Sequence, residues 1–128
     1  MIRSILAALL IFISAELQAG PPKVTGVYSN MRFGTEDVTG VEIFLTYSMK
    51  GYFAHVQCAE GAIGRPLLVP VIVAGSFIEF VVPVESAPNT YSCPPGKFKG
   101  EVSASGMNGK FEGTDWPGFI ERKKSYWQ

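Results

Sequence analysis

The sequence predicts an all-β fold: a single domain built as an antiparallel meander of about eight strands, closed as a small barrel or folded as a sandwich. Three observations support this fold class. Several short segments alternate apolar and polar residues, which is the period of a β-strand. Turn residues such as Gly, Pro, Asn and Ser separate these segments at short intervals. After the first 19 residues, no segment has the period of a helix.

Residues 1–19 are predicted to be a signal peptide that is cleaved after Ala19. Arg3 precedes an apolar run over residues 5–13, and small or neutral residues follow that run. Cleavage after Ala15 is the second choice, and a buried N-terminal helix is the alternative. The apolar run is short for a membrane span. We therefore expect the domain, residues 20–128, to be exported to the periplasm or secreted.

The charges of the chain are balanced. Lys and Arg total 11, as do Asp and Glu, so loss of Arg3 and Glu16 with the signal peptide leaves ten of each sign. A neutral domain gives no electrostatic reason to expect a nucleic acid or an anionic membrane surface as its partner. The remaining residues, about 109, are enough for one hydrophobic core but not for two.

Cys58 and Cys93 are expected to form a disulfide, which is the default for a lone pair of cysteines in an exported chain. The bond would close a loop of about 35 residues and contribute roughly 3–4 kcal/mol on the chain-entropy model. The alternatives are two free buried thiols or half of a metal site. The metal alternative has little support, because the chain has one His, His55, and no Cys-x-x-Cys. No metal or cofactor is predicted.

The stretch 66–84 is almost entirely apolar, and Glu79 is its only charged residue. Three prolines and the sequence Ala-Gly-Ser at 74–76 would break a membrane-spanning helix here, and Val, Ile and Phe favour strands. We therefore expect no membrane span after signal removal. The segment should instead form a hairpin of strands 67–73 and 77–82, with its turn at residues 74–75.

Alternation assigns the two faces of this hairpin. The inward set is Leu67, Val69, Val71, Ile78, Phe80 and Val82. The outward set is unusually apolar and comprises Leu68, Pro70, Ile72, Phe77, Glu79 and Val81. Pro70 implies an edge or a bulge within the first strand, because proline cannot donate to the ladder.

A second hairpin is predicted to join strands 41–47 and 52–58. A four-residue loop sets apolar residues opposite one another, whereas a three-residue loop would set them opposite Phe53, His55 and Gln57. We therefore expect the pairs Tyr47–Tyr52, Leu45–Ala54, Ile43–Val56 and Val41–Cys58. The opposite face then pairs Glu42 with Gln57, Phe44 with His55 and Thr46 with Phe53.

A third hairpin is predicted over residues 96–113, with its turn at residues 104–105. This turn aligns Val102 with Met107, Gly100 with Gly109, and Phe98 with Phe111. Facing glycines mark a bend or the close approach of another layer. Two further strands near 25–33 and 119–127 complete the sheet, and the basic tail 121–128 is interpreted as part of a last strand with one charged face.

Candidate catalytic groups are few and scattered in the sequence. His55 is interpreted as a surface or half-covered side chain, and Glu60 as a carboxylate at a strand end. Glu79 is interpreted as a residue that marks the solvent-exposed face of its strand. Trp116, after Asp115 in a loop, is expected to cover one end of the barrel.

Two functions are therefore considered. The first is a non-enzymatic binding module, with inhibitor-like and immunity-like proteins as examples. It would bind a protein partner, a second copy or an apolar ligand through one continuous apolar outer face, unless the loop 86–95 covers that face. The residues assigned to binding are Phe44, Phe53, His55, Ile72, Phe77 and Glu79. The alternative is a small hydrolase or isomerase that uses Glu60 or Glu79 in a barrel mouth.

Overall fold

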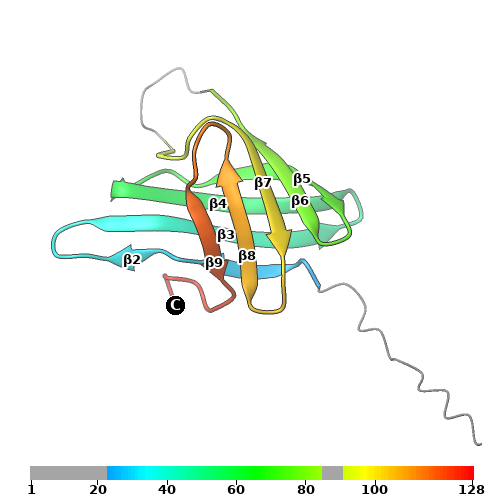
Figure 1. Ribbon diagram of the computed structural model, residues 1–128, viewed down its shortest axis with the longest axis horizontal. Helices are drawn as coiled ribbons and strands as arrows, with labels where there is room; N and C mark the ends of the chain where they lie inside the picture. The colour runs from blue at the N-terminus through cyan, green and yellow to red at the C-terminus, as the bar shows by residue number, and fades with distance from the viewer. Residues whose placement is uncertain (1–22, 85–90) are drawn as a thin grey trace, which may run out of the picture.

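The computed structural model describes residues 23–84 and 91–128. The predicted signal peptide, and residues 86–90 of the loop 86–95, lie outside the described residues. Within them, no helix is long and apolar enough to cross a membrane. The structure consists of strands (Figure 1): β1 (Gly26–Ser29), β2 (Arg32–Phe33), β3 (Val38–Ser48), β4 (Gly51–Ile63), β5 (Leu67–Ala74), β6 (Phe77–Val82), β7 (Gly96–Val102), β8 (Gly106–Phe111) and β9 (Pro117–Glu121).

The strands join antiparallel in the order β1-β3-β4-β5-β6-β7-β8-β9, with β2 paired to β3. Strand β5 forms the corner of this sheet, because its residues 67–71 pair with β4 whereas residues 72–74 pair with β6. The sheet therefore folds into two layers, and Figure 1 shows β7, β8 and β9 crossing steeply in front of β3 and β4. The predicted all-β meander is confirmed, and it is nearly closed into a barrel.

The hairpin of β3 and β4 has the predicted register. Tyr47 pairs with Tyr52, and Val41 pairs with Cys58 at the other end of the predicted ladder. Eleven consecutive pairs form, because the pairing extends beyond the predicted segments to Ser48–Gly51 at the turn and to Val38–Gly61 at the far end. The hairpin β7–β8 also has its predicted register.

The hairpin of β5 and β6 turns one residue later than predicted. Ala74 pairs with Phe77, so the turn residues are Gly75 and Ser76. Gly75 has φ +62°, a left-handed conformation that glycine adopts without the steric cost of a side chain. Moving the turn by one residue shifts the pairing by two, so every side chain keeps its predicted face. The predicted inward set is buried: Leu67, Val69, Val71, Ile78, Phe80 and Val82.

Pro70 lies within β5 at the point where this strand changes partner. It pairs with Phe53 of β4, whereas the pairing of β5 with β6 begins only at Ile72. Pro70 therefore has a strand partner on one side of its backbone, which suits a residue that cannot donate a hydrogen bond.

The interior of the barrel is filled by large apolar side chains. The ring centroids of Phe80 and Phe98 lie 4.6 Å apart, and those of Phe98 and Phe111 lie 5.0 Å apart. Gly109 makes room for this cluster, since a Cβ atom there would lie 2.4 Å from Cζ of Phe98. The predicted core residues Ile43, Val56, Phe80 and Phe98 are all buried.

The predicted strands at the two ends of the domain are wrong in extent. The strand expected over 25–33 is divided into β1 and β2 at Asn30, whose side-chain oxygen accepts a 2.7 Å hydrogen bond from the N–H of Val41. The last strand runs over Pro117–Glu121 rather than 119–127. Beyond it, Arg122 forms a single bridge with Tyr28 of β1, which brings the first and last strands together.

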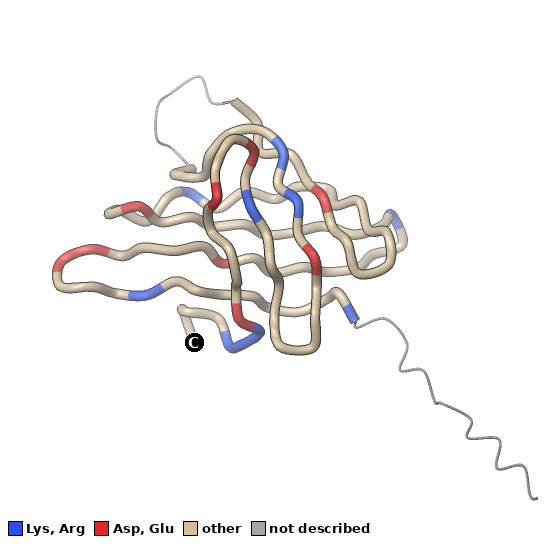
Figure 2. The backbone as a smooth tube through the Cα atoms, in the orientation of Figure 1, with Lys and Arg blue, Asp and Glu red and all other residues tan. Residues whose placement is uncertain are grey.

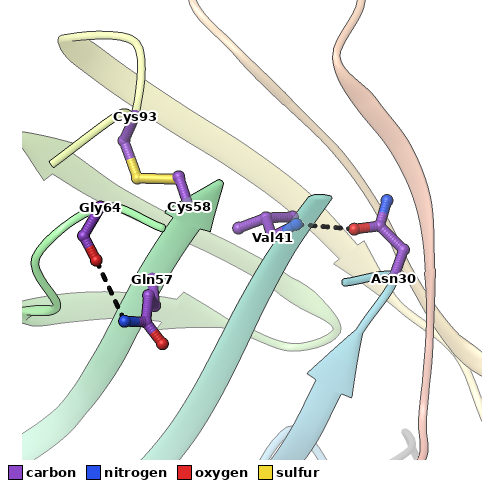
Figure 3. The surroundings of a disulfide bond; sticks show 6 residues. All are labelled: Asn30, Val41, Gln57, Cys58, Gly64 and Cys93. Carbon is purple, nitrogen blue, oxygen red and sulfur yellow. Dashed lines mark hydrogen bonds between the residues drawn. A yellow bond between two sulfur atoms is a disulfide. The ribbon is translucent and has the colours of Figure 1, made fainter. Parts of the chain in front are cut away.

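Cys58 of β4 and Cys93 form a disulfide, with their Cα atoms 5.2 Å apart (Figure 3). Beside it, the Gln57 side chain donates a 3.0 Å hydrogen bond to the carbonyl of Gly64, as Figure 3 shows. The backbone of Tyr91 packs so closely on Gly64 that a Cβ atom there would lie 2.1 Å from the Tyr91 oxygen. The disulfide and this contact attach the segment before β7 to the end of β4. A disulfide is consistent with an oxidising, exported location.

Candidate functional site

The residues predicted to bind a partner lie on the outer faces of two different layers. Phe44, Phe53 and His55 belong to the layer of β3 and β4, whereas Phe77 and Glu79 belong to β6 in the layer of β6–β9. Ile72 lies at the β5 corner, in the part that pairs with β6. The single continuous face expected from the sequence is therefore divided into two surfaces that point in different directions. The one sign of this corner in the sequence is Pro70, which implies an edge or a bulge within the strand.

The first surface is an apolar patch on the layer of β1, β3, β4 and β5. Strand pairing forms one row of Val27, Phe44, His55 and Leu68. A second row contains Phe53 and Pro70. Leu68 is 70% exposed and Phe44 is 45% exposed, although the inward neighbours of both are buried. We call these residues the apolar patch: Val27, Phe44, Phe53, His55, Leu68 and Pro70.

The C-terminal tail borders the apolar patch. The buried Glu42 carboxylate, one row away from Phe44, accepts hydrogen bonds from the Ser125 hydroxyl and from the Tyr126 N–H, the latter at 2.7 Å. Next to it, the Trp127 indole N–H donates to the Gln57 side chain at 2.9 Å.

Trp127 was not predicted as a site residue, but its side chain is 56% exposed. It is bonded to Gln57, whose row of paired residues lies next to the row that contains His55. The aromatic pair that ends the tail was visible in the sequence. Its position on β3 and β4 was not, because this contact joins residues about 70 positions apart.

The second surface lies on the opposite layer and consists of two parallel rows of side chains. We call it the two-row face. The first row is Ile72, Glu79, Lys99, Lys110 and Pro117. The second row is Ala74, Phe77, Glu101, Asn108 and Phe119. The members of these rows on β5, β6, β7 and β8 line an open groove of about 560 Å³.

The charges of the two-row face are only partly neutralised within the chain. Glu79 forms a 3.1 Å ion pair with Lys97, its diagonal neighbour, and this is the one ion pair among the described residues. Lys99 and Lys110 stand directly opposite one another, an arrangement of like charges that is destabilising on its own. Glu101, two residues along β7 from Lys99, is exposed.

The carboxylates considered for catalysis lie apart from one another. Glu79 is on an outer face rather than in a barrel mouth, and it is ion-paired with Lys97. Glu60 pairs with Thr39 in the part of β4 that extends beyond its pairing with β5. His55 is exposed, in agreement with its interpretation as a surface side chain. Among residues 23–84 and 91–128, no group of three or more His, Cys, Asp or Glu side chains is placed to hold a metal ion.

Trp116 belongs to the core rather than to a site. Its ring stacks on Phe111 with a centroid distance of 5.4 Å, and it is partly buried against the interior. Trp116 therefore packs against the core, and its place over one end of the barrel stays a prediction.

Comparisons with protein families, curated proteins and solved structures found no match to this chain. The molecule is thus defined by its own geometry: a disulfide-linked antiparallel β-barrel with a filled interior and two distinct outer surfaces.

Proposed function

We propose that this protein is an exported, non-enzymatic binding module that captures a protein partner on its apolar patch. The observation that carries the proposal is the exposure of Phe44 on β3 and Leu68 on β5, in one row on either side of His55 of β4. Scattered apolar residues are normal on a protein surface, but a contiguous group is typical of interaction sites. The predicted signal peptide and the disulfide support an extracytoplasmic location for this partner.

A protein partner suits the patch better than a small apolar ligand. Binding sites for small ligands are concave and enclose most of the ligand, whereas the patch is the outer surface of a sheet. The core of the barrel is filled by large apolar side chains, among them Phe80, Phe98, Phe111 and Met107. A flat apolar surface with a polar border is instead the usual form of a protein interface.

The tail supplies such a border. Trp127 presents an exposed aromatic ring beside the patch, and its indole N–H is held by Gln57. Trp is enriched among the residues that dominate binding energy in protein interfaces. Contact with a partner would remove more of the apolar area of Phe44, Leu68 and Trp127 from water, and this burial would favour binding. Inhibitor-like and immunity-like proteins act through surfaces of this kind without catalytic groups of their own.

Affinity capture from the extracytoplasmic fraction of the source cells tests the proposal. The bait is the oxidised mature chain, compared with a double variant, Phe44→Ser with Leu68→Ser. Because both side chains point outward, the variant should unfold at nearly the same urea concentration as the unmodified chain. We expect the variant to lose a captured protein that the unmodified chain retains.

Val81→Ser is the matched control, because Val81 is 57% exposed on β6, in the other layer. The control variant should retain the captured protein. Equal capture by all three baits, or loss of capture by the control alone, would contradict the proposal. Capture of no protein by the unmodified chain would also count against it.

A further inference from the structure

The two-row face carries a second inference, which uses the opposite layer and does not depend on the proposed function. We infer that this face binds a second copy of the same chain, so that the protein forms a two-fold symmetric dimer. A two-fold dimer requires a self-complementary surface, in which each residue finds its complement elsewhere on the same face. The strand register meets this requirement on β5, β7, β8 and β9, whereas on β6 it sets Glu79 against Phe77.

The symmetry can be followed row by row. Consider a two-fold axis that lies between the two rows and runs perpendicular to the strands, parallel to the rows. Rotation about this axis places the first row of one copy against the second row of the other copy, and the second row against the first. Lys99 of each copy then faces Glu101 of the other copy, and Lys110 faces Asn108. These residues are two apart on β7 and on β8 respectively, so the axis passes level with Gly100 and Gly109.

The charges favour a second copy over an acidic or a basic partner. Both signs lie on the strands of this layer, as Figure 2 shows for β6, β7 and β8. An acidic partner that neutralised Lys99 and Lys110 would also meet Glu101 and Asp115, and a basic partner would meet the lysines. A second copy presents both signs in mirrored order. It places the Glu101 carboxylate against Lys99 and the Asn108 amide against Lys110, and neither lysine has an ion pair among the described residues.

The apolar side chains are complementary in size under the same axis. At the β5 end, Ile72 faces the small Ala74 of the other copy, and at the β9 end Phe119 faces Pro117. On β6, Phe77 faces Glu79 of the other copy and lies diagonally next to its Ile72. Ile72 is 70% exposed and Phe77 is 57% exposed, so contact would remove substantial apolar area from water. The open groove of about 560 Å³ gives these side chains space to interdigitate.

The neutral charge of the domain adds to this argument. The predicted mature chain has ten residues of each sign, so no net repulsion opposes the approach of two copies. The inferred dimer interface combines solvent-exposed ion pairs with a modest apolar area. We therefore expect a dimer that forms reversibly and weakens as the salt concentration rises.

Sedimentation velocity of the oxidised mature chain, from about 5 to 500 µM, tests the inference, because this range covers the weak dimers expected of small interfaces. The unmodified chain should sediment as a dimer at the upper end. Lys99→Glu and Glu101→Lys each replace two opposite-charge contacts by repulsive ones, and each should weaken the dimer about tenfold or more. The double variant that carries both changes restores the pairing by symmetry and should dimerise like the unmodified chain.

Two further samples complete the design. An equimolar mixture of the two single variants should form a heterodimer, because each supplies the charge that the other lacks. Lys50→Glu, in the turn between β3 and β4, alters the net charge equally and should leave the dimer unchanged. A monomer at every concentration would overturn the inference, as would single variants that dimerise as well as the unmodified chain. Failure of both the double variant and the mixture to dimerise would overturn it too. None of these results bears on partner capture by the apolar patch.

Discussion

The guanidinium group of Arg122 lies over the ring of Tyr28, with its central carbon 4.8 Å from the ring centroid. The same side chain donates hydrogen bonds to the carbonyl oxygens of Thr25, at 3.0 Å, and of Ser103, at 3.3 Å. It also donates to the carbonyl of Lys23. One side chain therefore joins the chain before β1, the turn between β7 and β8, and the end of β9. These contacts reinforce the single strand bridge that brings the first and last strands together.

Replacement of Arg122 by Ala should destabilise the protein more than replacement of an ordinary surface arginine. The cation–π contact and the carbonyl hydrogen bonds are partly exposed, so we expect a loss of about 2 kcal/mol in the free energy of unfolding. Urea denaturation measures this loss. Arg32→Ala is the control, since Arg32 is exposed on β2, and it should change the free energy by less than about 0.5 kcal/mol. Equal effects of the two substitutions would contradict the role given to Arg122.

Tyr28 predicts how the stability depends on alkaline pH. Burial raises the pKa of its hydroxyl above the ordinary value of about 10, although the neighbouring Arg122 lowers it in part. The folded state therefore holds this proton more tightly than the unfolded state does. This contribution to stability is complete below the unfolded pKa and is lost as the pH rises through the folded pKa.

Free energies of unfolding, measured from about pH 8 to pH 11.5, test this dependence, because the range spans the unfolded pKa of about 10. The decrease at the alkaline end should be shallower in Tyr28→Phe. This variant also loses the 2.6 Å hydrogen bond to the Val24 carbonyl, which should cost about 1 kcal/mol at pH 8. If the free energy of unfolding decreased with pH equally in both proteins, the pKa of Tyr28 would not be raised in the folded state.

Glu42 holds the C-terminal tail, so Glu42→Gln should release it. The substitution removes a carboxylate that accepts two hydrogen bonds, from Ser125 and from the Tyr126 N–H. Each hydrogen bond to a charged group contributes about 1.5–3 kcal/mol. Trypsin should therefore cleave after Lys123 and Lys124 several times faster in the variant, a rate that mass spectrometry can follow. Glu60→Gln, an exposed carboxylate on β4, should leave the cleavage rate unchanged.

Two facing glycines offer a paired test of core packing. A Cβ atom at Gly109 would meet the Phe98 ring, which is fixed between Phe80 and Phe111, whereas a Cβ atom at Gly100 would meet the flexible end of Met107 at 2.8 Å. Gly109→Ala should therefore destabilise the protein by about 1–3 kcal/mol, and Gly100→Ala by less. Thermal unfolding of both variants gives the comparison. The opposite order would mean that the aromatic cluster adapts more easily than Met107.

The sequence predicted the register of the β3–β4 hairpin correctly because, of the two loop lengths compared, only one placed apolar residues opposite apolar residues. In the β3–β4 hairpin this rule set Ile43 across from Val56, both of which are buried. For the β5–β6 hairpin the rule was weaker. Turns at residues 74–75 and 75–76 give every side chain the same face, so alternation could not distinguish them. The conformation of Gly75 decides between the two turns.

The end of the domain was predicted less well because its structure depends on contacts between distant residues. The alternation in residues 121–128 is compatible with a strand, but Arg122 turns to the carbonyls before β1, and Ser125 turns to Glu42. These partners lie 97 and 83 positions away in the chain.

The candidate surfaces were predicted in part for a related reason. Alternation identified Leu68 and Ile72 as outward, and both are 70% exposed. It could not indicate that β5 bends between them and assigns them to different layers.

The most direct test of the proposed function is photo-crosslinking in the cells that make the protein. Leu68 is replaced by a photoreactive phenylalanine derivative, and the same derivative is placed at Val81 on the other layer as the control. Irradiation at position 68 should give a discrete adduct with another protein in the extracytoplasmic fraction, and irradiation at position 81 should not give that adduct. No adduct at position 68, or the same adduct from both positions, would contradict the assignment of the apolar patch as the partner-binding surface.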